Sequence, residues 1–195
     1  MQKITPFLWF DTQAQEAVEF YLSVFKDGKI HSMARFPEGS PGDNKPGQVM
    51  TIAFELKGQD FVALNGGPDY PFTNAVSLVV NCDSQEEIDY FWEKLAADGG
   101  EQVECGWVKD KFGLPWQIVP GKLWDWFNDP AKVKRVTAEV WQMKKLDLAT
   151  LERAAAGEWP GTHALNPQST QRTKNRTRRD KSQNQKTSPL INSNA

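Results

Sequence analysis

The sequence is poor in the residues most often used as metal ligands and nucleophiles, because its 195 residues include only two histidines and two cysteines. It also lacks a long apolar run, and its first ten residues, MQKITPFLWF, already contain a strand-like segment. We therefore expect neither a membrane span nor a signal peptide. Cys82 and Cys105 fall in separate expected strands, which favours two free thiols in a reducing compartment over a disulfide. The predicted location is cytoplasmic.

The positive charge of the chain is concentrated at one end. Residues 158–195 contain seven Lys/Arg and two Asp/Glu, whereas residues 1–157 contain sixteen and twenty-three. An acidic body without a basic stripe argues against nucleic-acid binding by the folded domain. The basic end has few large apolar residues, so it cannot bury enough surface to offset its ordering entropy. We predict a domain over 1–157 and a disordered tail over 158–195, which is either simply solvated or in contact with nucleic acid or acidic lipid.

The first part of the sequence predicts a strand, a helix and three further strands. Residues 3–10 form an apolar segment that ends at Asp11. Thr12 and Gln15 have the spacing of a capping box, so a helix should begin there and stop at Gly28. The strands that follow are expected at residues 28–37, 48–56 and 60–65, with a hairpin between the last two.

The same order then begins again. Residues 75–81 are apolar and β-branched, and Asp83 ends them. Ser84 and Glu87 have the spacing of a second capping box, and the helix that they open should stop at Gly99. Two copies that agree in order and spacing indicate an internal repeat.

The repeat predicts an α+β fold of two tandem βαβββ modules, at about residues 3–67 and 75–120. Their strands should pair mainly antiparallel, and the last hairpin should turn near residues 111–113. Residues 122–156 differ, since apolar residues recur there at helical spacing. We expect two short helices in this segment, packed against the sheet or against a partner subunit.

The segment from Cys105 to Pro120, CGWVKDKFGLPWQIVP, is the densest aromatic and β-branched run of the chain. Its strand periodicity places Gln117 among apolar neighbours. A buried polar side chain without a partner costs about 1–3 kcal/mol, so Gln117 should meet a partner or a ligand. Asp110 belongs to the charged turn KDK, where a solvated side chain is expected.

Four segments together resemble the PhnB-like branch of the vicinal oxygen chelate superfamily: WFDTQAQEAVEFYLSVF, SQEEIDYFWEKL, GWVKDKFGLPWQIVP and QMKKLDLATLERAAAG. This superfamily contains glyoxalase I, extradiol dioxygenases and bleomycin-resistance proteins. Members of the branch often carry the name demethylubiquinone 3-methyltransferase-like domain. The resemblance covers residues 3 to about 157. It implies a glyoxalase-like fold, in which two βαβββ modules form a cupped mixed sheet around a ligand cavity, usually in a homodimer.

This chain has no strong metal ligand at the positions that correspond to the metal site of this superfamily. The resemblance places the ligand positions near Ile4 to Pro6, near Asn65, at Val76 or Ser77, and at Gln117. Amides and hydroxyls are weak ligands for Zn²⁺ or Ni²⁺, and the two histidines, His31 and His163, lie elsewhere. We therefore predict no tightly bound metal and no cofactor, with a weakly held divalent ion as the alternative.

The candidate ligand contacts are polar and aromatic side chains of the expected strands: Trp9, Asn65, Ser77, Cys105, Trp107, Trp116 and Gln117. The amides and the hydroxyl would orient a small molecule, and the tryptophans would stack on a planar one or serve as core. No nearby His or Lys is evident to lower the pKa of Cys105, which favours a structural thiol over a nucleophile.

These observations favour a small-molecule-binding protein of the resistance type. One alternative is an enzyme of the lyase, dioxygenase or isomerase type that acts on a small oxygenated substrate. Another is a protein whose main role is dimeric interaction through residues 122–156. No catalytic residue is predicted. The methyltransferase name lacks support, since no glycine-rich methyl-donor motif follows a parallel strand.

Overall fold

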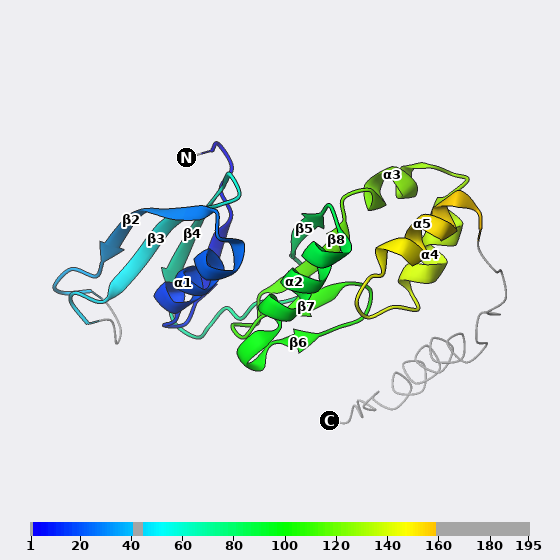
Figure 1. The fold of residues 1–195 in the computed structure, drawn as a ribbon. Coiled ribbons are helices and arrows are strands. Elements are labelled where there is room, and N and C mark those ends of the chain that lie inside the picture. Colours follow the sequence, from blue (N-terminus) through cyan, green and yellow to red (C-terminus); the bar gives the residue numbers. More distant parts are fainter. Residues whose placement is uncertain (1, 41–44, 159–195) are drawn as a thin grey trace, which may run out of the picture. The chain divides into compact units, whose positions relative to one another are not determined.

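A computed structural model describes residues 2–40 and 45–158. In these residues the chain folds into two βαβββ modules followed by three helices (Figure 1). The elements of the first module are β1 (Phe7–Phe10), α1 (Ala14–Phe25), β2 (Gly28–Arg35), β3 (Val49–Leu56) and β4 (Gln59–Asn65). Those of the second are β5 (Leu78–Cys82), α2 (Gln85–Leu95), the 3₁₀ turn η1 (Ala97–Gly99), β6 (Glu101–Gln102), β7 (Trp107–Lys109) and β8 (Pro115–Pro120). The predicted α+β fold and its repeat are confirmed.

Each module forms a four-stranded mixed sheet of its own. The strand order is β1-β4-β3-β2 in the first sheet and β5-β8-β7-β6 in the second. In both sheets the strand before the helix pairs in parallel with the last strand of the module. All other pairs are antiparallel, including the predicted hairpins β3–β4 and β7–β8. The repeat in the sequence is therefore a repeat of topology.

The two helices bury one face of each sheet in a shared core. Side chains alternate between the two faces along a strand. In β1, Leu8 and Phe10 are therefore buried, while Phe7 points to the opposite face and is 57% exposed. In β5, Val80 lies in the core and Val79 is 38% exposed. We call the face of each sheet opposite its helix the open face.

The capping box predicted at Thr12 does not form. Helix α1 begins at Ala14, and its own N-cap residue makes no capping hydrogen bond. The amide Oδ1 of Asn65, at the end of β4, accepts a hydrogen bond from the Ala14 N–H at 2.7 Å. The cap is therefore supplied by tertiary structure from a residue distant in sequence, which the local spacing could not reveal.

The predicted C-terminal stop of the first helix is wrong, whereas the predicted N-terminal cap of the second helix is confirmed. Helix α1 ends at Phe25 with Lys26 in the left-handed region, so the predicted stop at Gly28 is wrong and that glycine begins β2. The second capping box is confirmed, because the Ser84 hydroxyl accepts from the Glu87 N–H at 3.3 Å. The Glu87 carboxylate in turn accepts from the Asp83 N–H at 2.8 Å.

Among the described residues, three helices rather than the predicted two follow the second sheet. They are α3 (Leu123–Asn128), α4 (Val133–Val140) and α5 (Leu148–Ala156). Their buried residues form a second apolar cluster that includes Val119 of β8, so the predicted packing against the sheet is confirmed. No helix within residues 2–40 and 45–158 is long and apolar enough to cross a membrane. The predicted tail lies outside the described residues apart from Glu158.

Asp110 is a buried link between the two modules, so its expected solvated position was wrong. Its side chain is 3% exposed. One carboxylate oxygen accepts hydrogen bonds from the Tyr21 hydroxyl of α1 at 2.7 Å and from the Trp116 indole N–H at 2.9 Å. The other oxygen accepts from the backbone N–H groups of Phe112 at 2.9 Å and Leu114 at 3.0 Å. One carboxylate thus satisfies four donors from three segments.

Burial governs the protonation of this pair. It raises the pKa of Asp110, although its four hydrogen bonds act in the opposite direction. Burial, followed by the charge of Asp110, also raises the pKa of Tyr21 well above its ordinary value. Tyr21 therefore remains a hydrogen-bond donor to Asp110 at neutral pH.

Replacing Asp110 by Ala should lower the free energy of unfolding by at least about 3 kcal/mol, because four buried donors lose their acceptor at once. Tyr21→Phe removes a single donor and should cost about 1 kcal/mol. Urea unfolding followed by circular dichroism measures both, with Asp69→Asn in an exposed turn as the control. Equal unfolding midpoints for Asp110→Ala and Asp69→Asn would contradict the assigned role.

Candidate functional site

Three of the predicted ligand contacts lie together on the open face of the second sheet. Gln117 of β8 is in register with Val79 of β5 on one side and with Trp107 of β7 on the other. Its amide Nε2 donates a hydrogen bond to the hydroxyl of Ser77, just before β5, at 2.7 Å. Ser77, Trp107 and Gln117 are half-buried. We call the surface formed by Ser77, Val79, Trp107 and Gln117 the Gln117 face.

The Gln117 face offers both hydrogen-bond donors and acceptors. The Ser77 bond fixes the Gln117 amide and uses one of its two N–H groups. No buried side-chain N or O atom lacks a hydrogen-bond partner within the described ranges, so the Gln117 carbonyl oxygen reaches solvent. The free N–H, this oxygen and the Ser77 hydroxyl can therefore contact a polar group of a ligand. Trp107 and Val79 provide apolar area on either side.

Trp116 does not share this surface with its neighbour Gln117. Successive side chains of a strand point to opposite faces, and Trp116 is in register with Val108, which is fully buried on the helix-covered face. Its ring lies 5.4 Å from those of both Tyr21 and Phe25, measured between centroids. Its only indole N–H is bound to Asp110. Trp116 is therefore a core residue.

A cleft of about 920 Å³ adjoins this core, and Trp116 contributes to its wall. Its volume is within the range of small-molecule sites, roughly 300–1,000 Å³. The apolar part of the wall includes Phe25, Leu56, Phe61, Leu78 and Phe91. Its charged side chains are exposed to solvent, and the Tyr90 hydroxyl already donates to the Val24 carbonyl at 2.7 Å. The cleft wall also includes the amides of Gln59 and Asn81, and it reaches Val79 of the Gln117 face.

Trp9 and Asn65 belong to the first sheet and have structural partners. The indole N–H of Trp9 donates to the Gly67 carbonyl at 2.8 Å, and its ring meets Tyr70 edge to face. Asn65 points to the helix-covered face, where it caps α1 and its Nδ2 donates to the Val49 carbonyl at 2.9 Å. Both ends of this amide are therefore engaged within the first module.

Neither cysteine has the environment of a nucleophile. Cys105 is half-buried and packs against the cluster of C-terminal helices. Burial and then the charge of Glu104 raise its pKa above the ordinary value. Burial raises the pKa of Cys82 to about 12. Because the thiolate is the reactive form, these raised pKa values disfavour both side chains as nucleophiles at neutral pH.

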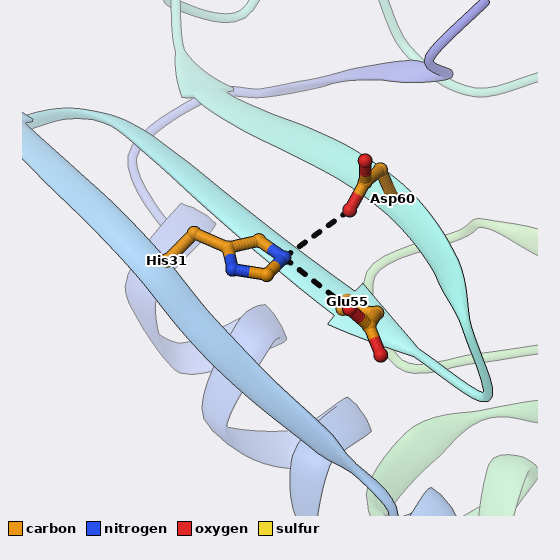
Figure 2. Close-up of side chains that lie close together, drawn as sticks. All are labelled: His31, Glu55 and Asp60. Atoms are coloured by element: carbon orange, nitrogen blue, oxygen red, sulfur yellow. Dashed lines mark hydrogen bonds and ion pairs between the residues drawn. The ribbon is translucent and has the colours of Figure 1, made fainter. Parts of the chain in front are cut away.

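A group that the sequence did not single out lies on the open face of the first sheet. His31, Glu55 and Asp60 bring their side-chain ends together there (Figure 2). The hairpin predicted around residues 57–59 could have paired Glu55 with Asp60. The approach of His31 depends on an irregularity in β2 that no local pattern marks.

Comparison with known proteins identifies a family to which most of the described chain is similar. The model of the family described as 3-demethylubiquinone-9 3-methyltransferase matches residues 2–119, which is more than half of the chain. A PhnB protein from Bacillus cereus, with the same description, shares 39% sequence identity and has a TM-score of 0.54. That comparison covers 61% of this chain and 99% of the Bacillus protein. No curated protein matches.

More distant solved structures also match. A Pseudomonas aeruginosa protein is 24% identical, with 60% of this chain and 96% of that chain covered and a TM-score of 0.49. A glyoxalase/bleomycin resistance protein from Albidiferax ferrireducens is 14% identical, with 61% and 100% covered and a TM-score of 0.37. The family match confirms the resemblance seen in the sequence. The chain belongs to the 3-demethylubiquinone-9 3-methyltransferase family, in its PhnB-like branch.

Proposed function

We propose that the protein binds a small molecule on the Gln117 face without a tightly bound metal. The observation that carries this proposal is the Gln117 amide, which Ser77 holds in place between Trp107 and Val79. A fixed amide beside an indole suits an aromatic or amphiphilic ligand that carries a carbonyl or hydroxyl group. The amide would set the orientation of the ligand, and the apolar side chains would supply contact area.

Binding is better supported than catalysis because the Gln117 face holds no group that exchanges a proton near neutral pH. An amide, a hydroxyl, an indole and an isopropyl group can orient a ligand but are poor general acids or bases. Cys105 is the one candidate nucleophile, and its raised pKa opposes that role. The second candidate function is an enzyme of the superfamily in which the Gln117 N–H polarises a substrate carbonyl. This second candidate function also rests on the Gln117 amide.

We further propose a cytoplasmic homodimer in which a second copy covers the Gln117 face. Small-molecule sites enclose most of the surface of their ligand, whereas Val79 is 38% exposed in a single copy. The open face of the first sheet presents Phe7, which is 57% exposed, as an apolar surface that a second copy could use. The two free thiols suit a reducing compartment.

Trp107→Phe should remove most of the change in tryptophan fluorescence that a ligand produces. Trp107 is in register with Gln117, so a ligand there meets its indole directly. The control is Trp141→Phe, since Trp141 is 66% exposed at the end of α4 and should keep the response. Titration with a library of aromatic and amphiphilic compounds provides the measurement. An undiminished response in Trp107→Phe would argue against this site.

Gln117→Leu should weaken binding about tenfold, which corresponds to the roughly 1.4 kcal/mol of a lost hydrogen bond to a ligand. Tyr90→Phe alters the wall of the cleft instead and should leave the affinity unchanged. Isothermal titration of both variants with the same compound separates the two locations. If Tyr90→Phe weakens binding and Gln117→Leu does not, the ligand occupies the cleft.

Phe7→Glu should dissociate the dimer, because it replaces an exposed apolar side chain on the open face of the first sheet by a charge. Trp141→Glu makes the same change on α4 and should leave the dimer intact. Light scattering after size-exclusion chromatography reports the mass of each variant. Dissociation by Trp141→Glu alone would assign the interface to the C-terminal helices, and a monomeric unmodified protein would contradict the proposed assembly.

A further inference from the structure

A cluster of one imidazole and two carboxylates lies on the open face of the first sheet. Strands β2, β3 and β4 contribute His31, Glu55 and Asp60, respectively, and their side chains point toward one another (Figure 2). The Nε2 atom of His31 is 3.5 Å from Glu55 Oε2 and 3.2 Å from Asp60 Oδ1. The three ligand atoms all lie within 4.8 Å of one another, a grouping that occurs once among residues 2–40 and 45–158.

The sheet places two negative charges directly opposite each other at this point. Glu55 and Asp60 are register partners across the β3–β4 hairpin. Like charges in that position destabilise a sheet, so a nearby positive group is required to offset them. The Gln2 backbone N–H donates a hydrogen bond to Asp60 Oδ2 at 2.8 Å, which fixes this carboxylate in place.

A β-bulge directs His31 at this acidic pair. The register of β2 with β3 passes from Ile30 opposite Phe54 to Ser32 opposite Ala53, which leaves His31 as the extra residue. Bulges re-aim side chains and often adjoin functional sites. The Nζ atom of Lys29 is 3.6 Å from Glu55 Oε2, and the Lys29 side chain is 65% exposed. An exposed ion pair of this kind contributes little.

We propose that His31, Glu55 and Asp60 bind a divalent metal ion of the Zn²⁺, Co²⁺ or Ni²⁺ class. Imidazole and carboxylate are ligands that these ions accept, whereas Mg²⁺ and Ca²⁺ prefer oxygen alone. Bonds of about 2.0–2.2 Å in a tetrahedral site put neighbouring ligand atoms roughly 3.3–3.6 Å apart. The His31 separations of 3.2 and 3.5 Å match that spacing, and the Glu55 and Asp60 ligand atoms lie within 4.8 Å of each other.

The surroundings leave a position for water or for a further ligand. The side chains of His31, Glu55 and Asp60 are 35%, 26% and 12% exposed. Of the two Asp60 oxygens, Oδ2 accepts from Gln2 and Oδ1 is directed at His31, as a ligand with a fixed second oxygen would be. The site lies in the first sheet, and it does not include Gln117. It therefore stands independently of the proposed ligand function.

Metal binding by the full-length protein tests this site. The protein is stripped with a chelator, dialysed against Zn²⁺ or Co²⁺, and assayed for bound metal and for the visible absorption of Co²⁺. We expect one ion per chain, with the absorption bands of a Co²⁺ ion that has nitrogen and oxygen ligands. Loss of one ligand in His31→Asn or Glu55→Gln should weaken binding by at least about 10–100-fold. Circular dichroism verifies that both variants are folded.

Matched variants make the outcome specific to this cluster. His163→Asn removes the only other histidine of the chain and should leave metal binding unchanged. Lys29→Gln removes a competing positive charge beside Glu55 and should tighten binding. Gln117→Leu should retain the metal even where it loses the small molecule. Equal metal content in the unmodified protein and in His31→Asn, or loss of metal in His163→Asn, would overturn the proposal and leave an ion-pair cluster only.

Discussion

The alternation of side chains along pleated strands is the constraint on which both surfaces of this protein depend. Each module covers one face of its sheet with a helix, so alternate residues of β1 and β5 enter the core and the residues between them lie on the open face. Trp116 and Gln117 are neighbours in sequence, yet one is buried beside Asp110 and the other faces Ser77. The same rule separates Asn65, which caps α1, from the acidic residues of the first open face.

The helix-covered faces also contain one strongly polar residue, Asp110, that stabilises the core. Asp110 is buried, and its carboxylate replaces water as the acceptor for Tyr21, Trp116 and two backbone N–H groups. Because Tyr21 belongs to the first module and Trp116 to the second, this carboxylate ties the modules together. On the open face of the second sheet, the C-terminal helices cover Val119, whereas Val79 remains 38% exposed. The polar groups of the two open faces, an amide on one sheet and an imidazole with two carboxylates on the other, offer different chemistry.

The sequence predicted the parts of the structure that local patterns determine. The repeat, the hairpins and the capping box at Ser84 follow from residues close together along the chain. Contacts between distant residues account for what was missed. The cap on α1 comes from Asn65, Asp110 meets Tyr21 across modules, and the His31 bulge depends on pairing with β3. Of the candidate site, Ser77, Trp107 and Gln117 come together, whereas Trp116 falls on the other face because successive residues of a strand point to opposite sides.

The central claim is that ligand recognition belongs to the open face of the second sheet. Side-chain N–H signals in ¹H–¹⁵N spectra test this most directly, because an amide or indole signal moves when a ligand contacts it. A compound that changes the tryptophan fluorescence should shift the Gln117 amide and the Trp107 indole signals and leave the Trp116 indole, which is bound to Asp110, in place. A shift of the Trp116 indole with an unchanged Gln117 amide would contradict the account and locate the ligand in the cleft.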